Sequence, residues 1–227
     1  MTRTKSSMSD AFANLISDAR RFFAELQADN TKDWFEANKA RYAQQIRKPA
    51  EALGEVMAAE LDRVAGRAFA SKVYRINRDV RFSKDNKPYN THLHMLWSFG
   101  AEDRPGWFLA VSPDSVSLSN GVMSFTTDGF DWARQAIADD PQPWLDALHG
   151  IRTDGGDLAD WGEPPLNRVP KPWDAEHPAA DLLRRKSLII TLPLDAADLS
   201  AGLVPVLCGA AARLMPFWSC FDGGAEP

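Results

Sequence analysis

The hydrophobic period of this chain changes near Val73, and that change limits the fold more than any other feature of the sequence. Before it, apolar residues recur every three or four positions over residues 12–26, 34–46 and 53–64, as they do in amphipathic helices. We expect Asn30 to cap the second of these helices and Pro49 to begin the third. The sequence therefore predicts a helical N-terminal part over residues 9–66.

After Val73, apolar and polar residues alternate, as in strands that bury one face. Alternation covers residues 74–82 and 92–99, and short apolar runs follow at 107–111, 116–118 and 122–125. Asn120-Gly121 is expected to form a turn between the last two runs. Because the links are too short for helical crossovers, we predict an antiparallel meander over residues 72–126.

The C-terminal part, residues 127–227, has a mixed pattern. It predicts helices near residues 127–137 and 141–150, a proline-rich irregular loop over 151–180, an internal strand at 187–192 and a final helical region that ends near Met215. The predicted fold class is α+β, with N-terminal helices packed on an antiparallel β-sheet and a C-terminal strand and helix that return to it. No linker rich in glycine or serine divides the chain, so we expect a single domain over residues 1–227.

Charge and composition exclude several classes of protein. The 227 residues carry a formal net charge of −5, which argues against a protein that coats nucleic acid or anionic membranes. The two cysteines are too few for a disulfide framework, and the N-terminus has no apolar segment typical of a signal peptide. We therefore expect a cytoplasmic protein.

No motif for a P-loop, a dinucleotide site or a serine hydrolase is present. We predict no cofactor, and the sequence leaves open both the oligomeric state and whether the protein is an enzyme.

One basic segment stands out in this acidic chain. The segment from Ser71 to His92 contains six cationic and two anionic side chains, which give it a local net charge of +4. The cations are Lys72, Arg75, Arg78, Arg81, Lys84 and Lys87, and the anions are Asp79 and Asp85. In a regular strand Arg75, Asp79 and Arg81 share the polar face, whereas Arg78 lies between Ile76 and Val80 on the apolar face.

Guanidinium groups that an aspartate holds in place can bind a phosphate or carboxylate through two parallel hydrogen bonds in one plane. We therefore expect an anionic small-molecule partner, bound by Arg75, Arg78, Asp79, Arg81, Lys84 and Lys87, with Arg168 and Lys171 added from the proline-rich loop.

Two other interpretations remain open. In the first, Asp79 ties the arginines into a structural ion-pair network, and the protein is a non-catalytic scaffold or interaction protein. In the second, His92 and His94 lie on one side of a strand and hold a metal for hydrolysis, with a third ligand such as His177. If the anion site is catalytic, then the candidate proton carriers are His92, His177 and Tyr89.

The pattern Arg-Ile-Asn-Arg-Asp-Val-Arg-Phe at residues 75–82 resembles the R-x-x-R-D-x-R-F signature of a bacterial family, domain of unknown function 2461. Residues 30–42, 166–171 and 177–184 resemble further blocks of that family, so the likeness covers nearly the whole chain. The chain departs from the family pattern at Asn86, where a lysine is usual. The resemblance implies a fold and the position of a site, but no reaction.

Overall fold

The computed structural model describes residues 12–79, 85–100, 104–159, 161, 164–195, 199 and 202–222. Its N-terminal part contains α2 (Leu15–Ala28), α3 (Lys32–Arg41), the π-helix η1 (Tyr42–Arg47) and α4 (Lys48–Ala65). The predicted apolar face of α2 is buried along its whole length. The predicted helical part is therefore confirmed, although two of its boundaries differ.

The α3, η1 and α4 segments follow one another without a break, so Pro49 does not begin a separate helix. Pro49 has no N–H to donate within a helix, and it lies directly after the wide turn of η1. Thr31 rather than Asn30 caps α3, because its hydroxyl accepts a hydrogen bond from the Trp34 N–H. Asn30 instead binds the backbone of Tyr89.

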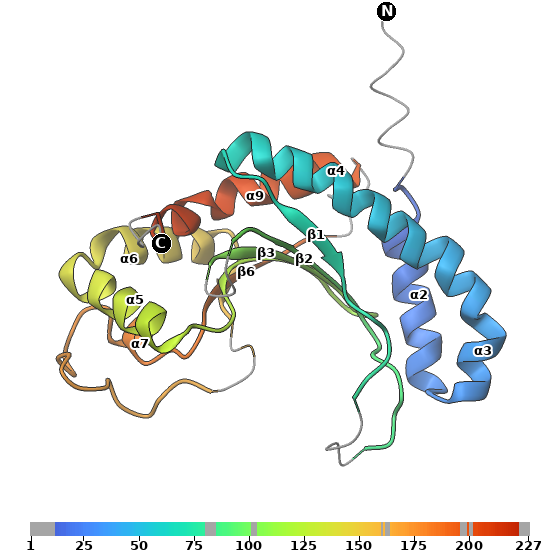
Figure 1. Ribbon diagram of the computed structural model, residues 1–227, viewed down its shortest axis with the longest axis horizontal. Coiled ribbons are helices and arrows are strands. Elements are labelled where there is room, and N and C mark those ends of the chain that lie inside the picture. Colours follow the sequence, from blue (N-terminus) through green and yellow to red (C-terminus); the bar gives the residue numbers. More distant parts are fainter. Residues whose placement is uncertain are drawn as a thin grey trace, which may run out of the picture. The chain divides into compact units, whose positions relative to one another are not determined.

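Six strands form one antiparallel sheet, in the order β1-β2-β3-β4-β6-β5 (Figure 1). They are β1 (Ala70–Val73), β2 (Leu93–Ser98), β3 (Gly106–Val111), β4 (Val116–Val122), β5 (Asp157–Leu158) and β6 (Leu188–Pro193). The first four are neighbours in chain order, as predicted for a meander. The C-terminal strand β6 returns to lie beside β4, which completes the predicted α+β architecture.

The predicted strand over residues 74–82 is wrong in its described part. Regular β1 pairing ends at Val73, and only an isolated bridge joins Asn77 to Tyr89 further along. The Arg78 N–H donates to the Pro88 carbonyl. Pro88 has no N–H, so it cannot donate the second hydrogen bond, to the Arg78 carbonyl, that a regular strand pair would have here. Residues 80–84 lie outside the described part of the chain.

The predicted turn at Asn120-Gly121 is also wrong, because β4 runs straight through it to Val122. Asn120 is fully buried, and its amide donates to the Leu214 carbonyl at 3.4 Å. A Cβ at position 121 would lie 1.9 Å from the Leu188 carbonyl oxygen of β6. Gly121 is therefore in the strand because it lets β6 approach, and its φ of +134° also favours glycine.

The remaining helices are α5 (Thr127–Asp139), α6 (Gln142–Thr153), α7 (Ala180–Leu183) and α9 (Leu203–Ser219). None of the helices within the described ranges is long and apolar enough to cross a membrane.

The chain packs as two compact units. The first comprises Met1–Trp97, Phe108–Leu118 and Leu194–Gly209, and the second comprises Ser98–Trp107, Ser119–Pro193 and Ala210–Pro227. In the first unit, Trp97 of β2 is buried against α4, and its indole N–H donates to the Gly54 carbonyl at 2.9 Å. In the second unit, Trp107 stacks on Trp218 with ring centroids 5.3 Å apart. The single domain expected from the sequence stays a prediction.

Candidate functional site

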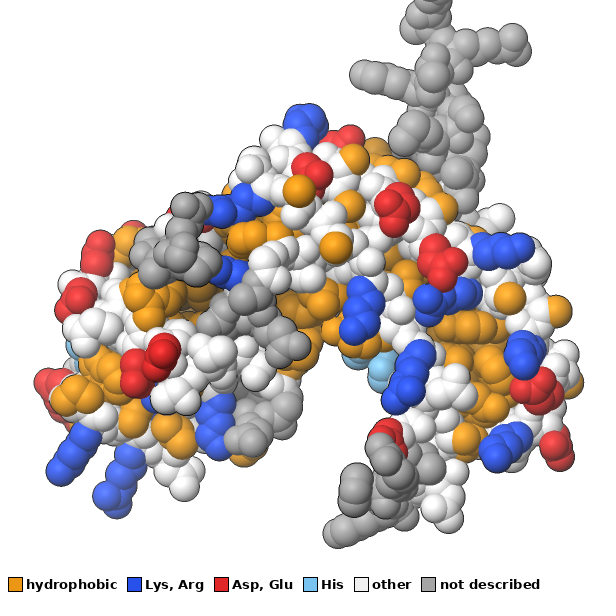
Figure 2. Space-filling model, in the orientation of Figure 1, with side chains coloured by type: hydrophobic (Ala, Val, Ile, Leu, Met, Phe, Trp, Pro, Cys, Tyr) orange, Lys and Arg blue, Asp and Glu red, His pale blue; other side chains and the backbone are white. Residues whose placement is uncertain are grey.

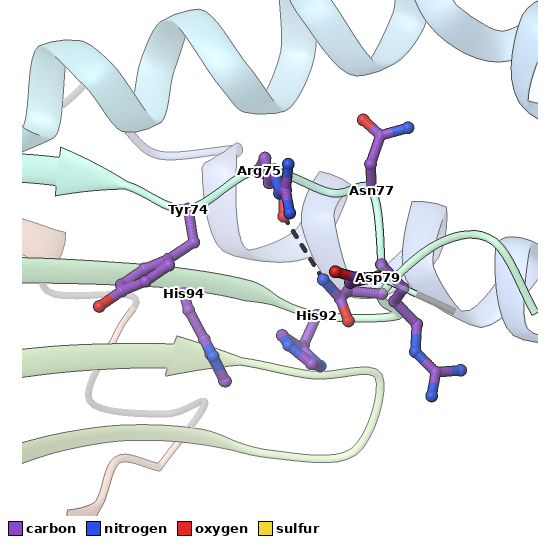
Figure 3. A pocket seen from close by; sticks show the side chains of 8 residues that line it. Tyr74, Arg75, Asn77, Asp79, His92 and His94 are labelled. Atoms are coloured by element: carbon purple, nitrogen blue, oxygen red, sulfur yellow. Dashed lines mark hydrogen bonds between the residues drawn. The ribbon is translucent and has the colours of Figure 1, made fainter. Parts of the chain in front are cut away.

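A pocket of about 280 Å³ lies in the first unit, at the end of β1 and the start of β2. Its lining comes from two short segments, residues 74–79 and 90–94 (Figure 3). The lining residues are Tyr74, Arg75, Asn77, Arg78, Asp79, Asn90, His92 and His94. Both segments belong to the basic stretch that the sequence singles out.

Backbone hydrogen bonds place the two segments side by side. The Tyr74 N–H donates to the His94 carbonyl at 2.9 Å, and the Asn90 N–H donates to the Ile76 carbonyl at 2.7 Å. Ile76 is buried, whereas Arg75 and Asn77 on either side of it are exposed. The predicted alternation thus holds from Arg75 to Asn77, whereas Tyr74, predicted for the apolar face, is exposed and lines the pocket.

The alternation fails at Arg78, which lines the same pocket as Asn77 and Asp79. Three consecutive residues therefore line one pocket, although the Asn77 side chain points away from His92 and His94 (Figure 3). Arg78 does not lie among apolar neighbours as predicted. Its side chain is 29% exposed, and Nη1 donates to Asp85 Oδ1 at 2.8 Å and to the Lys87 carbonyl at 3.4 Å.

The helices hold both segments in place. Arg47 at the end of η1 donates from Nη1 to the carbonyls of Val73 and Tyr74, at 3.1 and 3.3 Å. On the other segment, Asn30 Nδ2 donates to the Tyr89 carbonyl at 2.9 Å, and the Tyr89 N–H donates to Asn30 Oδ1 at 3.1 Å. The backbone of the pocket is therefore fixed on both sides by side chains from the helical part.

His92, directly before β2, and His94, within β2, project to the same side, into the pocket (Figure 3). Leu93, Met95 and Trp97 on the opposite face are buried, which confirms the predicted alternation. The two imidazole rings stack with centroids 3.9 Å apart and planes at 25°.

Both histidines have a lowered pKa. Loss of water around the ring, followed by the positive charge of Arg78, lowers the pKa of His92. Loss of water, followed by repulsion from His92, lowers the pKa of His94 to about 4. At neutral pH each ring is therefore uncharged and offers one N–H donor and one acceptor nitrogen.

Arg75 is the exposed cation of the pocket. Within the described part of the chain its guanidinium has no hydrogen-bond or ion-pair partner, whereas its own carbonyl accepts from Asn90 Nδ2 at 3.4 Å. A guanidinium keeps its charge at any physiological pH and has five N–H groups to donate.

Comparison with protein families matches residues 18–219 to the family described as "Conserved hypothetical protein (DUF2461)". The chain belongs to the DUF2461 family. A search of curated proteins found no match. The resemblance inferred from the sequence is confirmed at the level of the family, and the match spans both segments of the pocket.

In this DUF2461 chain, four of the predicted site residues line the pocket together: Arg75, Arg78, Asp79 and His92. Arg81 and Lys84 lie outside the described residues. Lys87 is exposed and does not line the pocket, although its carbonyl accepts from Arg78.

Tyr89 was predicted as a proton carrier, but this residue is only 6% exposed and does not line the pocket. Its ring stacks on Phe35 of α3 with centroids 4.2 Å apart. Burial is also the main cause of its raised pKa. These contacts describe a core residue that fixes the hairpin on the helices.

The predicted residues of the proline-rich loop belong to the second unit. Arg168 and Lys171 are exposed there. His177 uses both ring nitrogens within its own unit: Nδ1 accepts from the Ala179 N–H at 3.1 Å, and Nε2 lies 3.3 Å from the Ala138 carbonyl. These two contacts join the start of α7 to the end of α5, so they have a structural role.

A metal site would need a third ligand beside His92 and His94. No group of three histidine, cysteine, aspartate or glutamate side chains is arranged to hold a metal ion anywhere in the described ranges. The geometry of these residues therefore gives the metal-hydrolase interpretation no support.

Sequence reasoning missed Asn90. Its signal was the alternation of β2 itself, because a position two residues before His92 faces the same side of an extended segment.

Proposed function

We propose that this pocket binds a small molecule that carries a phosphate or carboxylate group. Arg75 and Arg78 supply the positive charge, and the amide group of Asn90 supplies a neutral hydrogen-bond donor. In the space-filling view, histidine surface reaches the solvent close to where β1 ends, with lysine and arginine side chains beside it (Figure 2). The observation that carries the proposal is Arg75, a pocket cation without a partner in the described part of the chain.

The size of the pocket favours a small ligand. Its volume of about 280 Å³ is just below the range usual for ligand sites. A phosphate ester of a few carbons, or a dicarboxylic acid, fits this volume better than a dinucleotide does.

The test is a titration of the protein with inorganic phosphate and with succinate, followed by NMR of the His92 and His94 ring protons. We expect saturable shifts of both rings, because they line the same pocket as the guanidinium groups. Arg75→Gln should weaken binding by about tenfold or more, since a charge-assisted hydrogen bond is worth about 1.5–3 kcal/mol.

The matched control is Arg63→Gln. Arg63 is another exposed arginine, on α4; it is paired with Glu60 and does not line the pocket. The control removes the same charge and should leave binding unchanged. An equal loss of affinity in the two variants would show that only the net charge of the protein matters. If millimolar phosphate and succinate cause no shifts of the histidine ring protons, the proposal is refuted.

A structural role is the second candidate, and the contacts of Arg78 favour it. Arg78 joins the two segments of the pocket through Asp85 and the Lys87 carbonyl. Its partial exposure limits how much this ion pair stabilises the fold.

A further inference from the structure

The pocket contains hydrogen-bond acceptors as well as donors. Asp79 contributes a carboxylate to the same lining as Arg75 and Arg78. A carboxylate repels an anion that has only acceptor atoms, so it weakens a site for such an anion. The same carboxylate strengthens the binding of an anion that brings an N–H or O–H group, and ionised aspartate keeps acceptor positions even when one oxygen is paired.

We propose that the natural ligand combines an anionic group with a hydrogen-bond donor of its own, and that Asp79 accepts from this donor while Arg75 and Arg78 bind the charge. Two chemical classes meet this requirement: phosphates that retain a proton, and hydroxy acids. The inference rests on the proposed function, because it specifies the ligand of the same pocket.

The histidines support this assignment. Figure 3 shows Asp79 on the side of the pocket where His92 lies, with His94 nearer to Tyr74. With lowered pKa values the two rings are neutral near pH 7, so each adds one acceptor nitrogen to the lining. The pocket therefore matches a ligand that both donates and accepts.

Inorganic phosphate and sulfate provide the sharpest comparison. At about pH 8 both are tetrahedral dianions of nearly the same size, but hydrogen phosphate keeps one O–H, whereas sulfate has none. Their net charges are equal, so attraction to the arginines does not separate them. A higher affinity for phosphate than for sulfate would then show that an acceptor in the pocket binds the O–H group of hydrogen phosphate.

We would measure the affinity for both anions by calorimetry or NMR titration at about pH 8 and constant ionic strength. Wild-type protein should bind phosphate about tenfold or more tightly than sulfate, because hydrogen phosphate can donate its O–H to the Asp79 carboxylate, whereas sulfate only faces the charge of that carboxylate. In the Asp79→Asn variant an amide can donate to either anion, and the two affinities should come within about threefold.

The control variant is Asp33→Asn, which neutralises an exposed carboxylate in the first turn of α3 and should keep the wild-type preference. Malate and succinate form the corresponding carboxylate pair, which differs by one hydroxyl. A malate preference without a phosphate preference would assign the site to hydroxy acids, and the reverse would assign it to phosphates.

The outcomes separate the two proposals. Saturable binding of phosphate and sulfate with equal affinity, together with equal binding of malate and succinate, overturns the present inference and leaves the proposed function standing. A preference that survives Asp79→Asn also overturns it, because Asp79 is then not its source. If none of the four compounds binds, the proposed function fails, and this inference fails with it.

Discussion

The two histidines of the pocket lie two residues apart, His92 directly before β2 and His94 within it, and their rings stack with centroids 3.9 Å apart. Two positive charges at that distance repel each other strongly, so the second ring resists protonation after the first is charged. The pair therefore keeps the pocket from gaining two further charges when no ligand is present.

At the scale of this residue pair we predict that His94 titrates near pH 4 in an NMR pH titration. The unfolded chain binds this proton more tightly, since its pKa is close to the ordinary value of 6.5. Stability should therefore fall as the pH drops from about 6.5 to 4, and His94→Gln should remove that part of the loss. Replacement of His92 by Gln should raise the pKa of His94, because the repulsion is gone. A pKa near 6.5 in wild-type protein would contradict this account.

Much of the site at residue scale follows from sequence. The alternation of β2 predicts that His92 and His94 share a face, and the density of arginine predicts where an anion would bind. The position of Arg78 was not predictable in this way. It depends on Pro88 across the hairpin, which interrupts the ladder and lets residues 77–79 depart from strand geometry.

At the scale of elements, the hairpin that forms the pocket has two kinds of support. Asn30 makes a pair of hydrogen bonds to the backbone of Tyr89, at 2.9 and 3.1 Å, in a partly buried position. Arg78 makes its ion pair with Asp85, whose side chain is 53% exposed. Backbone groups left unpaired in a partly buried place cost more than an exposed ion pair contributes.

We predict that Asn30→Ala lowers the free energy of unfolding by about 1–3 kcal/mol, because it leaves the Tyr89 N–H and carbonyl without partners. Arg78→Ala should lower it by no more than about 1 kcal/mol, while it weakens phosphate binding clearly. Urea unfolding and a phosphate titration of both variants test this. If Arg78→Ala destabilises more than Asn30→Ala and binding is unchanged, then the structural network is the main role of Arg78.

Element types were predictable where a long pattern repeats, as on the buried faces of α2 and β2. Local signals misled where a tertiary contact decides. Asn120-Gly121 has the composition of a turn, yet the glycine serves the approach of β6, a strand that lies far along the chain. Pro49 likewise has the signature of a helix start, but a π-helical turn precedes it within one continuous helix.

At the scale of the whole molecule, the return of β6 to the meander depends on its contact with β4. Ser119 Oγ and Thr191 Oγ1 lie 2.8 Å apart across these strands, and Gly121 packs against the backbone of Leu188. The chain order of the meander follows from its short links, but nothing local in the sequence states that β6 inserts beside β4 rather than β1.

We predict that Gly121→Ala lowers the free energy of unfolding by more than about 3 kcal/mol, because the added Cβ meets the Leu188 carbonyl oxygen and the backbone has a positive φ. Gly150→Ala is the matched control. Gly150 lies in α6 with open space around it, so the change should be neutral or stabilise by up to about 1 kcal/mol. Thermal or urea unfolding measures both, and equal behaviour of the two variants would contradict the close approach.

The π-helical turn of η1 has a consequence for the support of the pocket. One extra residue in a helical turn rotates everything after it by about 100° relative to an unbroken α-helix. Before this turn, the ring of Phe35 stacks on Tyr89 in one segment of the hairpin. At the end of the turn, Arg47 donates hydrogen bonds to the carbonyls of Val73 and Tyr74 in the other segment. One continuous helical segment thus contacts both sides of the hairpin, and the phase of this segment after η1 decides where Arg47 meets the backbone of Val73 and Tyr74.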